Sequence, residues 1–126
     1  MLDQIKDSER MVVDVAQASE YYYYDGTLQQ NQTFSAPIVN AQGKARLAYL
    51  FANVPGSVGS ITFRVDVSPN LNMSPYWDRV NVSPAAGAGT SGDIVLPAQF
   101  FQIKIFASST SGSYSYRAFV ALHPVS

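Results

Sequence analysis

The chain has 126 residues, of which 13% are charged, against about 25% in an average soluble protein. This length suits one domain with a core of its own. The chain contains no cysteine, so disulfides and thiolate metal sites are excluded. Its 8 basic and 9 acidic residues give no electrostatic reason to bind nucleic acid or an anionic membrane. No apolar run approaches the length of a membrane span, and the first ten residues are too polar for a signal peptide, so we expect a soluble chain made in the cytoplasm.

Residues 1–18 are predicted to form an N-terminal arm ahead of the domain. The β-branched residues Val12 and Val13 favour a short strand over a helix, and residues 11–15 form a β-like run. A terminal arm of this kind either frays or docks on a neighbouring subunit, and the sequence leaves both alternatives open. In the docking hypothesis Met11 and Val13 belong to the interface.

Residues 19–126 are predicted to form an all-β domain, a single antiparallel β-sandwich of about eight strands with jelly-roll or immunoglobulin-like topology. The clearest strand is 61–67, in which apolar residues alternate with Thr62, Arg64 and Asp66, so that one face belongs to the core and the other is wet. The other predicted strands are 11–15, 33–39, 47–53, 78–82, 93–96, 101–105 and 114–122. Residues 108–113 are expected to join the last two strands into a hairpin, and residues 83–92 to be a long loop without regular structure.

The chain offers few groups that could carry catalysis. Its one histidine, His123, lies at the end of the last predicted strand, which indicates a surface residue and not a general base. No Gly-x-Ser-x-Gly nucleophile motif occurs, and the best-placed carboxylates, Asp66 and Asp78, are explained by a solvated strand face or a turn. The sequence also lacks clustered metal ligands and a glycine-rich nucleotide loop. We therefore expect no enzyme activity and no bound metal or cofactor.

Four consecutive tyrosines are the most unusual feature of the sequence. Strand alternation would send Tyr21 and Tyr23 to one face and Tyr22 and Tyr24 to the other. Tyrosine suits half-buried sites, where its ring is covered and its hydroxyl reaches water or a partner. Three interpretations remain open: a strand with one face in the core and one on the rim, a protein interface, or a platform for a sugar ring.

The pair Tyr76 and Trp77 raises a similar choice, because an exposed Trp can stack on a sugar ring whereas a buried one anchors two sheets. The surrounding motifs are a strand ending in Ser68-Pro69-Asn70, Trp77 a few residues on, the step Leu96-Pro97, the strand Phe101-Gln102-Ile103-Lys104-Ile105, and a Ser/Gly-rich connection to a final strand. Over residues 60–122 this pattern resembles small β-sandwich virion structural proteins of tailed bacteriophages. The sequence departs from it at Asn70, where the pattern has Asp followed by Gly, and in the long insert before Trp77.

The resemblance implies a non-enzymatic subunit of a phage virion, either a capsid decoration or cement protein or part of a head or tail appendage. The expected partners are further copies of the chain, with a trimer as the expectation by analogy, and the major capsid protein or other virion proteins. The expected location is the virion, assembled in the host cytoplasm. The alternative function is a carbohydrate- or host-surface-binding module with Tyr76 and Trp77 in its site. The virion hypothesis predicts a buried Trp77, and the alternative predicts an exposed one.

Overall fold

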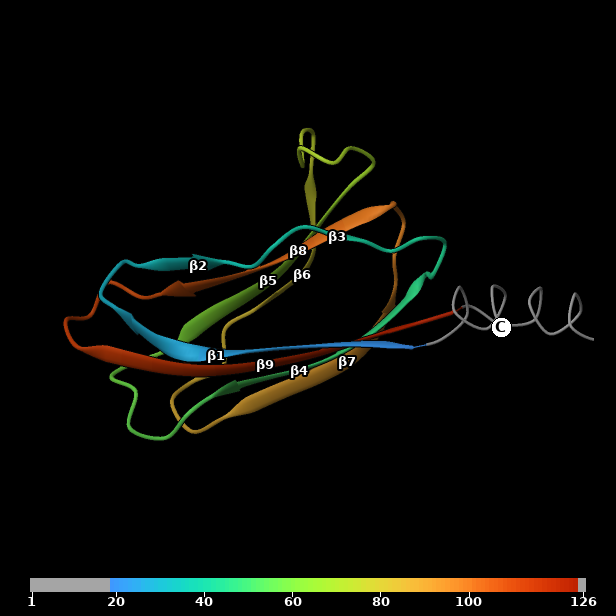
Figure 1. Cartoon of the computed structure of the whole chain (residues 1–126). Helices are drawn as coiled ribbons and strands as arrows, with labels where there is room; N and C mark the ends of the chain where they lie inside the picture. The colour runs from blue at the N-terminus through green and yellow to red at the C-terminus, as the bar shows by residue number, and fades with distance from the viewer. Residues whose placement is uncertain (1–18, 125–126) are drawn as a thin grey trace, which may run out of the picture.

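The computed structural model describes residues 19–124, which form two antiparallel β-sheets packed face to face (Figure 1). The strands are β1 (Glu20–Gln29), β2 (Thr33–Ser35), β3 (Val39–Asn40), β4 (Arg46–Asn53), β5 (Ile61–Ser68), β6 (Trp77–Val82), β7 (Gly89–Val95), β8 (Phe100–Ala107) and β9 (Ser113–His123). Sheet A has the order β1-β9-β4-β7. Sheet B has the order β2-β8-β5-β6, with β3 also paired to β8. Within the described range no helix is long and apolar enough to cross a membrane.

The strands pair in a nested order. The first strand pairs with the last, β2 and β3 both pair with β8, β4 pairs with β7, and β5 pairs with β6. This arrangement of antiparallel pairs folded over one another is a jelly roll, built from two Greek keys. The predicted all-β sandwich is therefore confirmed, and the topology is the jelly roll and not the immunoglobulin-like alternative.

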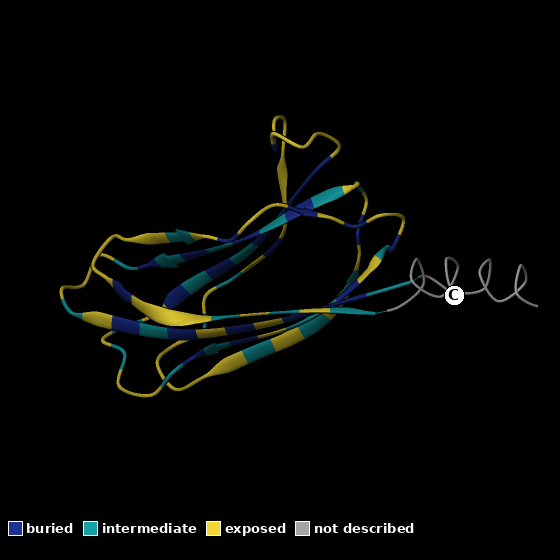
Figure 2. Cartoon of the chain, in the orientation of Figure 1, coloured by how far each residue is buried: buried dark blue, intermediate teal, exposed yellow. Residues whose placement is uncertain are grey.

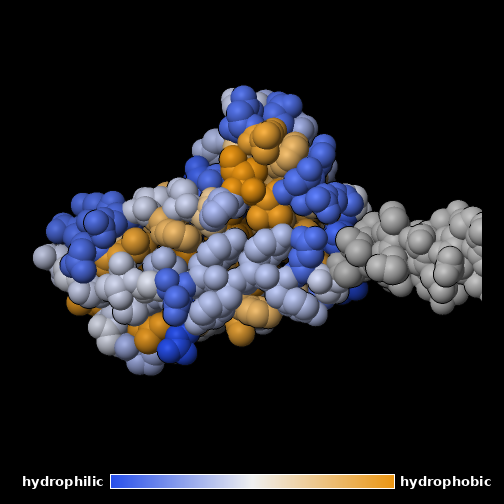
Figure 3. Space-filling model, in the orientation of Figure 1, coloured by the Kyte–Doolittle hydropathy of each residue, from blue (hydrophilic) through white to orange (hydrophobic). Residues whose placement is uncertain are grey.

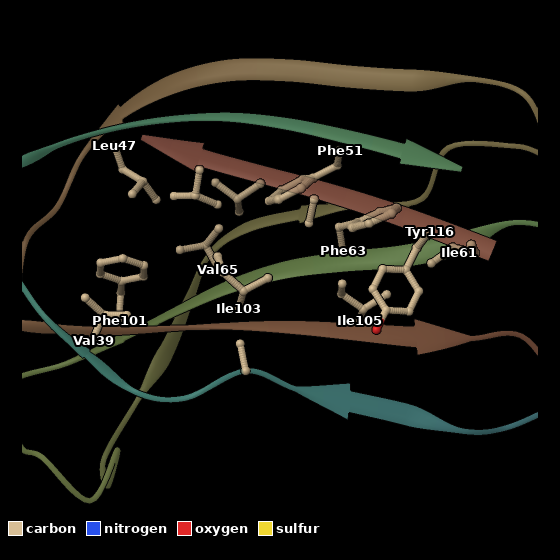
Figure 4. Packing of buried hydrophobic residues seen from close by; sticks show 14 of the residues in the cluster. Val39, Leu47, Phe51, Ile61, Phe63, Val65, Phe101, Ile103, Ile105 and Tyr116 are labelled. Atoms are coloured by element: carbon tan, nitrogen blue, oxygen red, sulfur yellow. The ribbon is translucent and has the colours of Figure 1, made fainter. Parts of the chain in front are cut away.

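The core lies between the two sheets and is built from alternate residues of each strand (Figure 2). In β5 the four apolar residues of the predicted core face, from Ile61 to Val67, are fully buried. Phe51 of β4 stacks on Phe63 of β5 across the gap between the sheets, with ring centroids 4.9 Å apart and ring planes at 7° (Figure 4). Burying an aromatic side chain of this size contributes about 1.5–3 kcal/mol, so this pair is a main tie between the sheets.

The connection between β8 and β9 does not close the predicted hairpin. β8 lies in sheet B and β9 in sheet A, so residues 108–113 cross from one sheet to the other. Each strand has one continuous apolar face, and placing the strands in opposite sheets buries both faces in one core. The buried Tyr114 holds this crossing in place, because its hydroxyl donates to the carbonyl of Thr110 at 2.5 Å and lies 2.7 Å from the hydroxyl of Ser108.

Two further predicted segments differ from the structure. Residues 83–92 are not a loop throughout, because β7 begins at Gly89 and pairs with β4 along its whole length. The predicted strand 33–39 is divided into β2 and β3, with Pro37, which has no backbone N–H to donate to a ladder, between them. The predicted strand 11–15 lies outside the described residues.

Gly92 allows β7 to pair closely with β4. The phenol ring of Tyr49, its partner in the register, lies across the glycine, and a Cβ at position 92 would sit 2.5 Å from the tyrosine hydroxyl. The same tyrosine stacks on Phe51 with ring centroids 4.8 Å apart. The glycine thus leaves room for an aromatic side chain that extends the core toward the sheet edge.

Replacing Gly92 with Ala is expected to lower the free energy of unfolding by about 1–3 kcal/mol, because the added methyl group displaces the Tyr49 ring from its stack. Denaturant unfolding of the two proteins measures this difference. In a Tyr49→Ala background the same substitution should cost much less, since the obstructing ring is gone. An equal cost in both backgrounds would contradict the assignment.

Candidate functional site

Sheet A carries a group of exposed apolar side chains on the face that points away from the core. We call this group the outer apolar face; its members are Tyr21 and Tyr23 of β1, Leu50 of β4, Val95 of β7 and Phe119 of β9. Their exposed fractions range from 40% for Phe119 to 64% for Tyr21. Large apolar side chains gathered on one sheet face, and left uncovered by the described chain, mark an interaction surface.

The strand register places three of these side chains, Tyr23, Phe119 and Leu50, in one row. Tyr23 lies opposite Phe119, Phe119 opposite Leu50, and Leu50 opposite Ser91, so one row crosses all four strands without a charged side chain. Tyr21 stacks on Phe119 with ring centroids 6.1 Å apart. Such cross-strand aromatic pairs hold the surface in a fixed shape.

Charged residues lie toward the two ends of this face. At one end Asp25 of β1 lies directly opposite Arg117 of β9. At the other end Arg46 of β4 forms an ion pair with Asp93 of β7, which holds the pKa of that carboxyl below its usual range. An apolar centre with a charged rim is the arrangement found at protein–protein interfaces.

The other two tyrosines of β1 point into the sandwich. Tyr22 meets the Phe101 ring edge-on with centroids 6.3 Å apart, and Tyr24 lies 5.8 Å from the Phe34 ring. Burial and the hydrogen bond that its hydroxyl donates to Glu20 raise the pKa of Tyr22 to about 12. The alternation expected for the four tyrosines is therefore present, and their role in an interface stays a prediction.

Two polar contacts fix the start of β1. The ammonium of Lys44, which is buried, lies 3.4 Å from a carboxylate oxygen of Glu20. The hydroxyl of Ser19 lies 2.7 Å from Nδ1 of His123. His123 is thus a strand-end residue with a polar partner. The other predicted interface residues, Met11 and Val13, lie outside the described residues.

A second surface is the connection between β5 and β6, which projects from the sandwich in Figure 1 and carries apolar surface below a hydrophilic tip in Figure 3. We call residues 69–76 the projecting loop. Two hydrogen bonds define its shape. The side-chain amide of Asn70 donates to the carbonyl of Ser74 at 2.8 Å, and the hydroxyl of Ser68, the last residue of β5, donates to the carbonyl of Pro75 at 2.5 Å. Leu71 is exposed on this loop.

The prediction that Trp77 is buried is wrong, since 45% of this residue is exposed. Trp77 opens the edge strand β6 and pairs with Val67, near the end of sheet B where the projecting loop leaves the sandwich. Tyr76 is also exposed, yet its ring lies over Arg64 on the outer face of sheet B. Tyr76 stands in the projecting loop just before the strand, and its ring is engaged by Arg64 and Lys104, so it is not paired with Trp77 in one platform.

Below the Tyr76 ring lies a cluster of four charged residues, Arg64, Asp66, Asp78 and Lys104, which we call the charge cluster. The guanidinium of Arg64 donates two hydrogen bonds to Asp66, at 2.7 and 2.8 Å, and lies 3.1 Å from Asp78. The ammonium of Lys104 lies 3.8 Å from Asp66 and 5.4 Å from the centre of the Tyr76 ring.

The predicted wet face of β5 is therefore wrong at Asp66, which is fully buried although it points away from the core. Long side chains cover it, in particular Arg64 of the same strand and Lys104 of the neighbouring strand β8. Burial raises the pKa of Asp66 and the adjacent Asp78 raises it further, while the hydrogen bonds from Arg64 act in the opposite direction. Such an ion cluster fixes the outer surface of sheet B, and both of its carboxylates lie within ion-pair distance of Arg64.

Two shallow hollows stand out among the described residues. One, of about 420 Å³, is bordered by Lys44 and by the segments 41–45 and 96–99; the other, of about 280 Å³, lies beside Asp25 and Arg117. Neither hollow is lined by a histidine. Within residues 19–124 no three His, Cys, Asp or Glu residues stand close enough to hold a metal ion.

Comparison with known proteins places the chain by its fold. No protein-family model matches the sequence, and no curated protein matches it. The solved structure of PBSX exported protein XepA matches with a TM-score of 0.69 and 12% identity over 89% of this chain, which spans 39% of that one. The pilus protein of Bacillus endospore appendages, from a family of disulfide-linked pili, matches with a TM-score of 0.58 and 12% identity over 86% of this chain and 88% of that one. The Yersinia pseudotuberculosis-derived mitogen matches with a TM-score of 0.53 and 14% identity over 85% of this chain and 89% of that one. At such identities these likenesses show a shared β-sandwich fold.

The charge cluster gives a testable dependence of stability on pH. Because the pKa of Asp66 is higher in the folded protein than in the unfolded chain, the folded protein binds the proton first, and this group adds stability as the pH falls from 7 toward about 4. We therefore expect the difference in unfolding free energy, wild type minus Asp66→Asn, to increase as the pH is lowered from 7 toward about 4. Glu20 and Asp93 are present in both proteins, so the subtraction cancels their contributions to the pH dependence, which have the opposite sign because their pKa values are lowered. A difference that stays flat or falls contradicts the assignment.

Proposed function

We propose that this protein is a non-enzymatic structural subunit of a bacteriophage virion, of the capsid-decoration, cement or head/tail-appendage type, and that it self-associates through the outer apolar face of sheet A. The observation that carries the proposal is the uncharged row Tyr23–Phe119–Leu50–Ser91, three of whose members are large exposed apolar side chains. Leaving such a row in water costs free energy, and a partner surface removes that cost.

The fold supports the proposal. Jelly rolls form viral capsid domains, although they also form lectins. One solved structure that shares the fold is the pilus protein of Bacillus endospore appendages, which form disulfide-linked pili. The resemblance of residues 60–122 to phage virion proteins points the same way.

The proposed partners are other copies of the chain and the major capsid protein or other virion proteins. A defined homo-oligomer is expected, with three subunits as the specific expectation, because a symmetric particle offers repeated equivalent positions. Residues 1–18, including Met11 and Val13, are proposed to contribute to these contacts. They precede Ser19 and Glu20, whose contacts with His123 and Lys44 hold the start of β1 in place.

Replacing Phe119 with Ser should weaken self-association, because Phe119 lies at the centre of the outer apolar face and stacks on Tyr21. An interface residue of this kind contributes about 2 kcal/mol, so the dissociation constant should rise roughly 30-fold. Light scattering over a concentration series measures the change, and thermal unfolding checks that the variant stays folded. Leu71→Ser is the control, since Leu71 is a large exposed apolar residue, 65% exposed against 40% for Phe119, but lies on the projecting loop.

A wild-type protein that remains a monomer at every concentration contradicts self-association. An oligomer that survives Phe119→Ser but dissociates with Leu71→Ser moves the interface to the projecting loop. The same measurement on a chain that begins at Ser19 tests the contribution of residues 1–18, and an unchanged mass removes them from the interface.

The exposure of Trp77 favours a second candidate function, the binding of a carbohydrate or host surface. An exposed indole offers one flat face to a sugar ring, and the polar side chains of the projecting loop could supply hydrogen bonds. Because the Tyr76 ring packs over Arg64 and Lys104, this candidate site depends on Trp77 for stacking.

The fluorescence of the protein decides between the two functions at this surface, since Trp77 is the one tryptophan of the chain. Its exposure predicts a red-shifted emission that a soluble quencher such as acrylamide reduces strongly. Under the virion proposal, glycans leave both the emission and the quenching unchanged. A saturable shift in emission with a defined glycan, abolished in parallel with its binding by Trp77→Ala in a calorimetric titration, would establish the second function.

A further inference from the structure

The edge strands of the two sheets differ in length and regularity. In sheet B one edge is divided into the short strands β2 and β3, and the other edge, β6, carries a bulge opposite Val65 and Asp66. Short, interrupted and bulged edges prevent a sheet from pairing with another chain. Sheet B thus has two protected edges.

Sheet A has two long regular edges. β1 runs for 10 residues and β7 for 7, and neither contains a proline, a lysine or a break in register. Within residues 19–124 each of these strands pairs on one side only, β1 with β9 and β7 with β4. Asp93 of β7 already pairs with Arg46, and Asp25 of β1 lies opposite Arg117, so a neighbour on either edge would not isolate a charge.

The hydrogen-bond pattern shows which residues direct their backbone groups toward the open edges. The N–H of Leu96 donates to the carbonyl of Ala45, and that of Asn53 donates to the carbonyl of Ala88. Since hydrogen-bonded pairs alternate in an antiparallel ladder, the even-numbered residues of β7 bond to β4. Gly89, Ser91, Asp93 and Val95 therefore direct their N–H and C=O groups outward.

The same reasoning applies to β1. The N–H of Val54 donates to the carbonyl of Ser115, so the odd-numbered residues of β9 bond to β4 and its even-numbered residues bond to β1. In β1 the odd-numbered residues, including Tyr21 and Tyr23, then direct their backbone groups outward. On both edges the outward backbone groups belong to residues whose side chains lie on the outer face of sheet A.

We propose that β7 of one copy pairs with β1 of a second copy, so that sheet A continues from subunit to subunit. The inference rests on the proposed self-association and adds an edge contact to it, which leaves Phe119 and Leu50 of the outer apolar face free for a further partner surface. Because sheet A has four antiparallel strands, β7 and β1 run in opposite directions, and a neighbour in the same orientation presents β1 antiparallel to β7. The partner is a second copy of this chain, since each copy carries both members of the pair.

The pairing extends the outer apolar face across the junction. With rows aligned, Tyr23 of the second copy falls opposite Ser91, and Tyr21 falls opposite Asp93. No two like charges meet in this register. On the inner side Tyr22, Tyr24 and Ile94, which are half-buried against the core near the two edges, lose further exposed surface.

A contact between two different edges is heterologous, so it closes into a ring or grows into a filament according to the rotation between neighbours. A ring of three subunits satisfies the expected trimer. A two-fold pairing of β1 with β1, or of β7 with β7, would instead stop at a dimer.

Cross-linking distinguishes these arrangements because the native chain contains no cysteine. Chains carrying only Tyr23→Cys and chains carrying only Ser91→Cys, one of them enlarged by a tag, are mixed and treated with a short bis-maleimide. Within one chain positions 23 and 91 are on opposite edges of sheet A, about 14 Å apart across three strand spacings. The proposal predicts the mixed dimer as the main product. Tyr21→Cys in place of Tyr23→Cys covers a register shifted by two residues.

Ser91→Pro tests the pairing without cross-links, because it removes an outward N–H and leaves the bonds to β4 intact. The oligomer should dissociate at least tenfold more readily than wild type, with unchanged far-ultraviolet circular dichroism. Ser91→Ala, which keeps the N–H, should associate like wild type.

The outcomes separate this inference from the proposed function. An oligomer that survives Ser91→Pro, with like-with-like cross-links in place of mixed ones, overturns the edge pairing and leaves self-association standing. A wild-type chain that stays a monomer overturns both.

Discussion

The requirement that every strand bury one face between two sheets determines most of this structure. Side chains alternate along a strand, so each strand contributes half of its residues to one layer. The stack of Phe51 on Phe63 joins the two layers at the point where β4 faces β5. With the inner faces used in this way, function is left to the outer faces, the edges and the loops.

The sequence predicted the inner faces well because alternation is a local property. In residues 61–67 the apolar positions are all buried, as expected. Strand neighbours could not be predicted, since pairing joins residues distant in the chain, and the supposed hairpin at residues 108–113 in fact crosses between sheets. Asp66 and Trp77 were placed wrongly for a related reason: their burial depends on how neighbouring side chains and strands are arranged in space, as with Arg64 and Lys104 over Asp66.

The candidate site was only partly visible in the sequence. The tyrosine run marked β1, and its alternation correctly separated Tyr21 and Tyr23 from the two that pack inward. Phe119, Leu50 and Val95 were not singled out, because each is an ordinary apolar residue until the register aligns four strands. A useful signal was available in the last strand, where Phe119 interrupts the polar side of the alternation.

The two outer surfaces of the sandwich differ in chemistry. Sheet A presents Tyr21, Tyr23 and Phe119, whereas sheet B presents the charge cluster under Tyr76. A molecule with one apolar surface and one charged surface takes a preferred orientation at a boundary between an apolar phase and water. In the proposed virion role, sheet A would face the protein shell and sheet B the solvent, so a layer of such molecules would change the wettability and the charge of the shell.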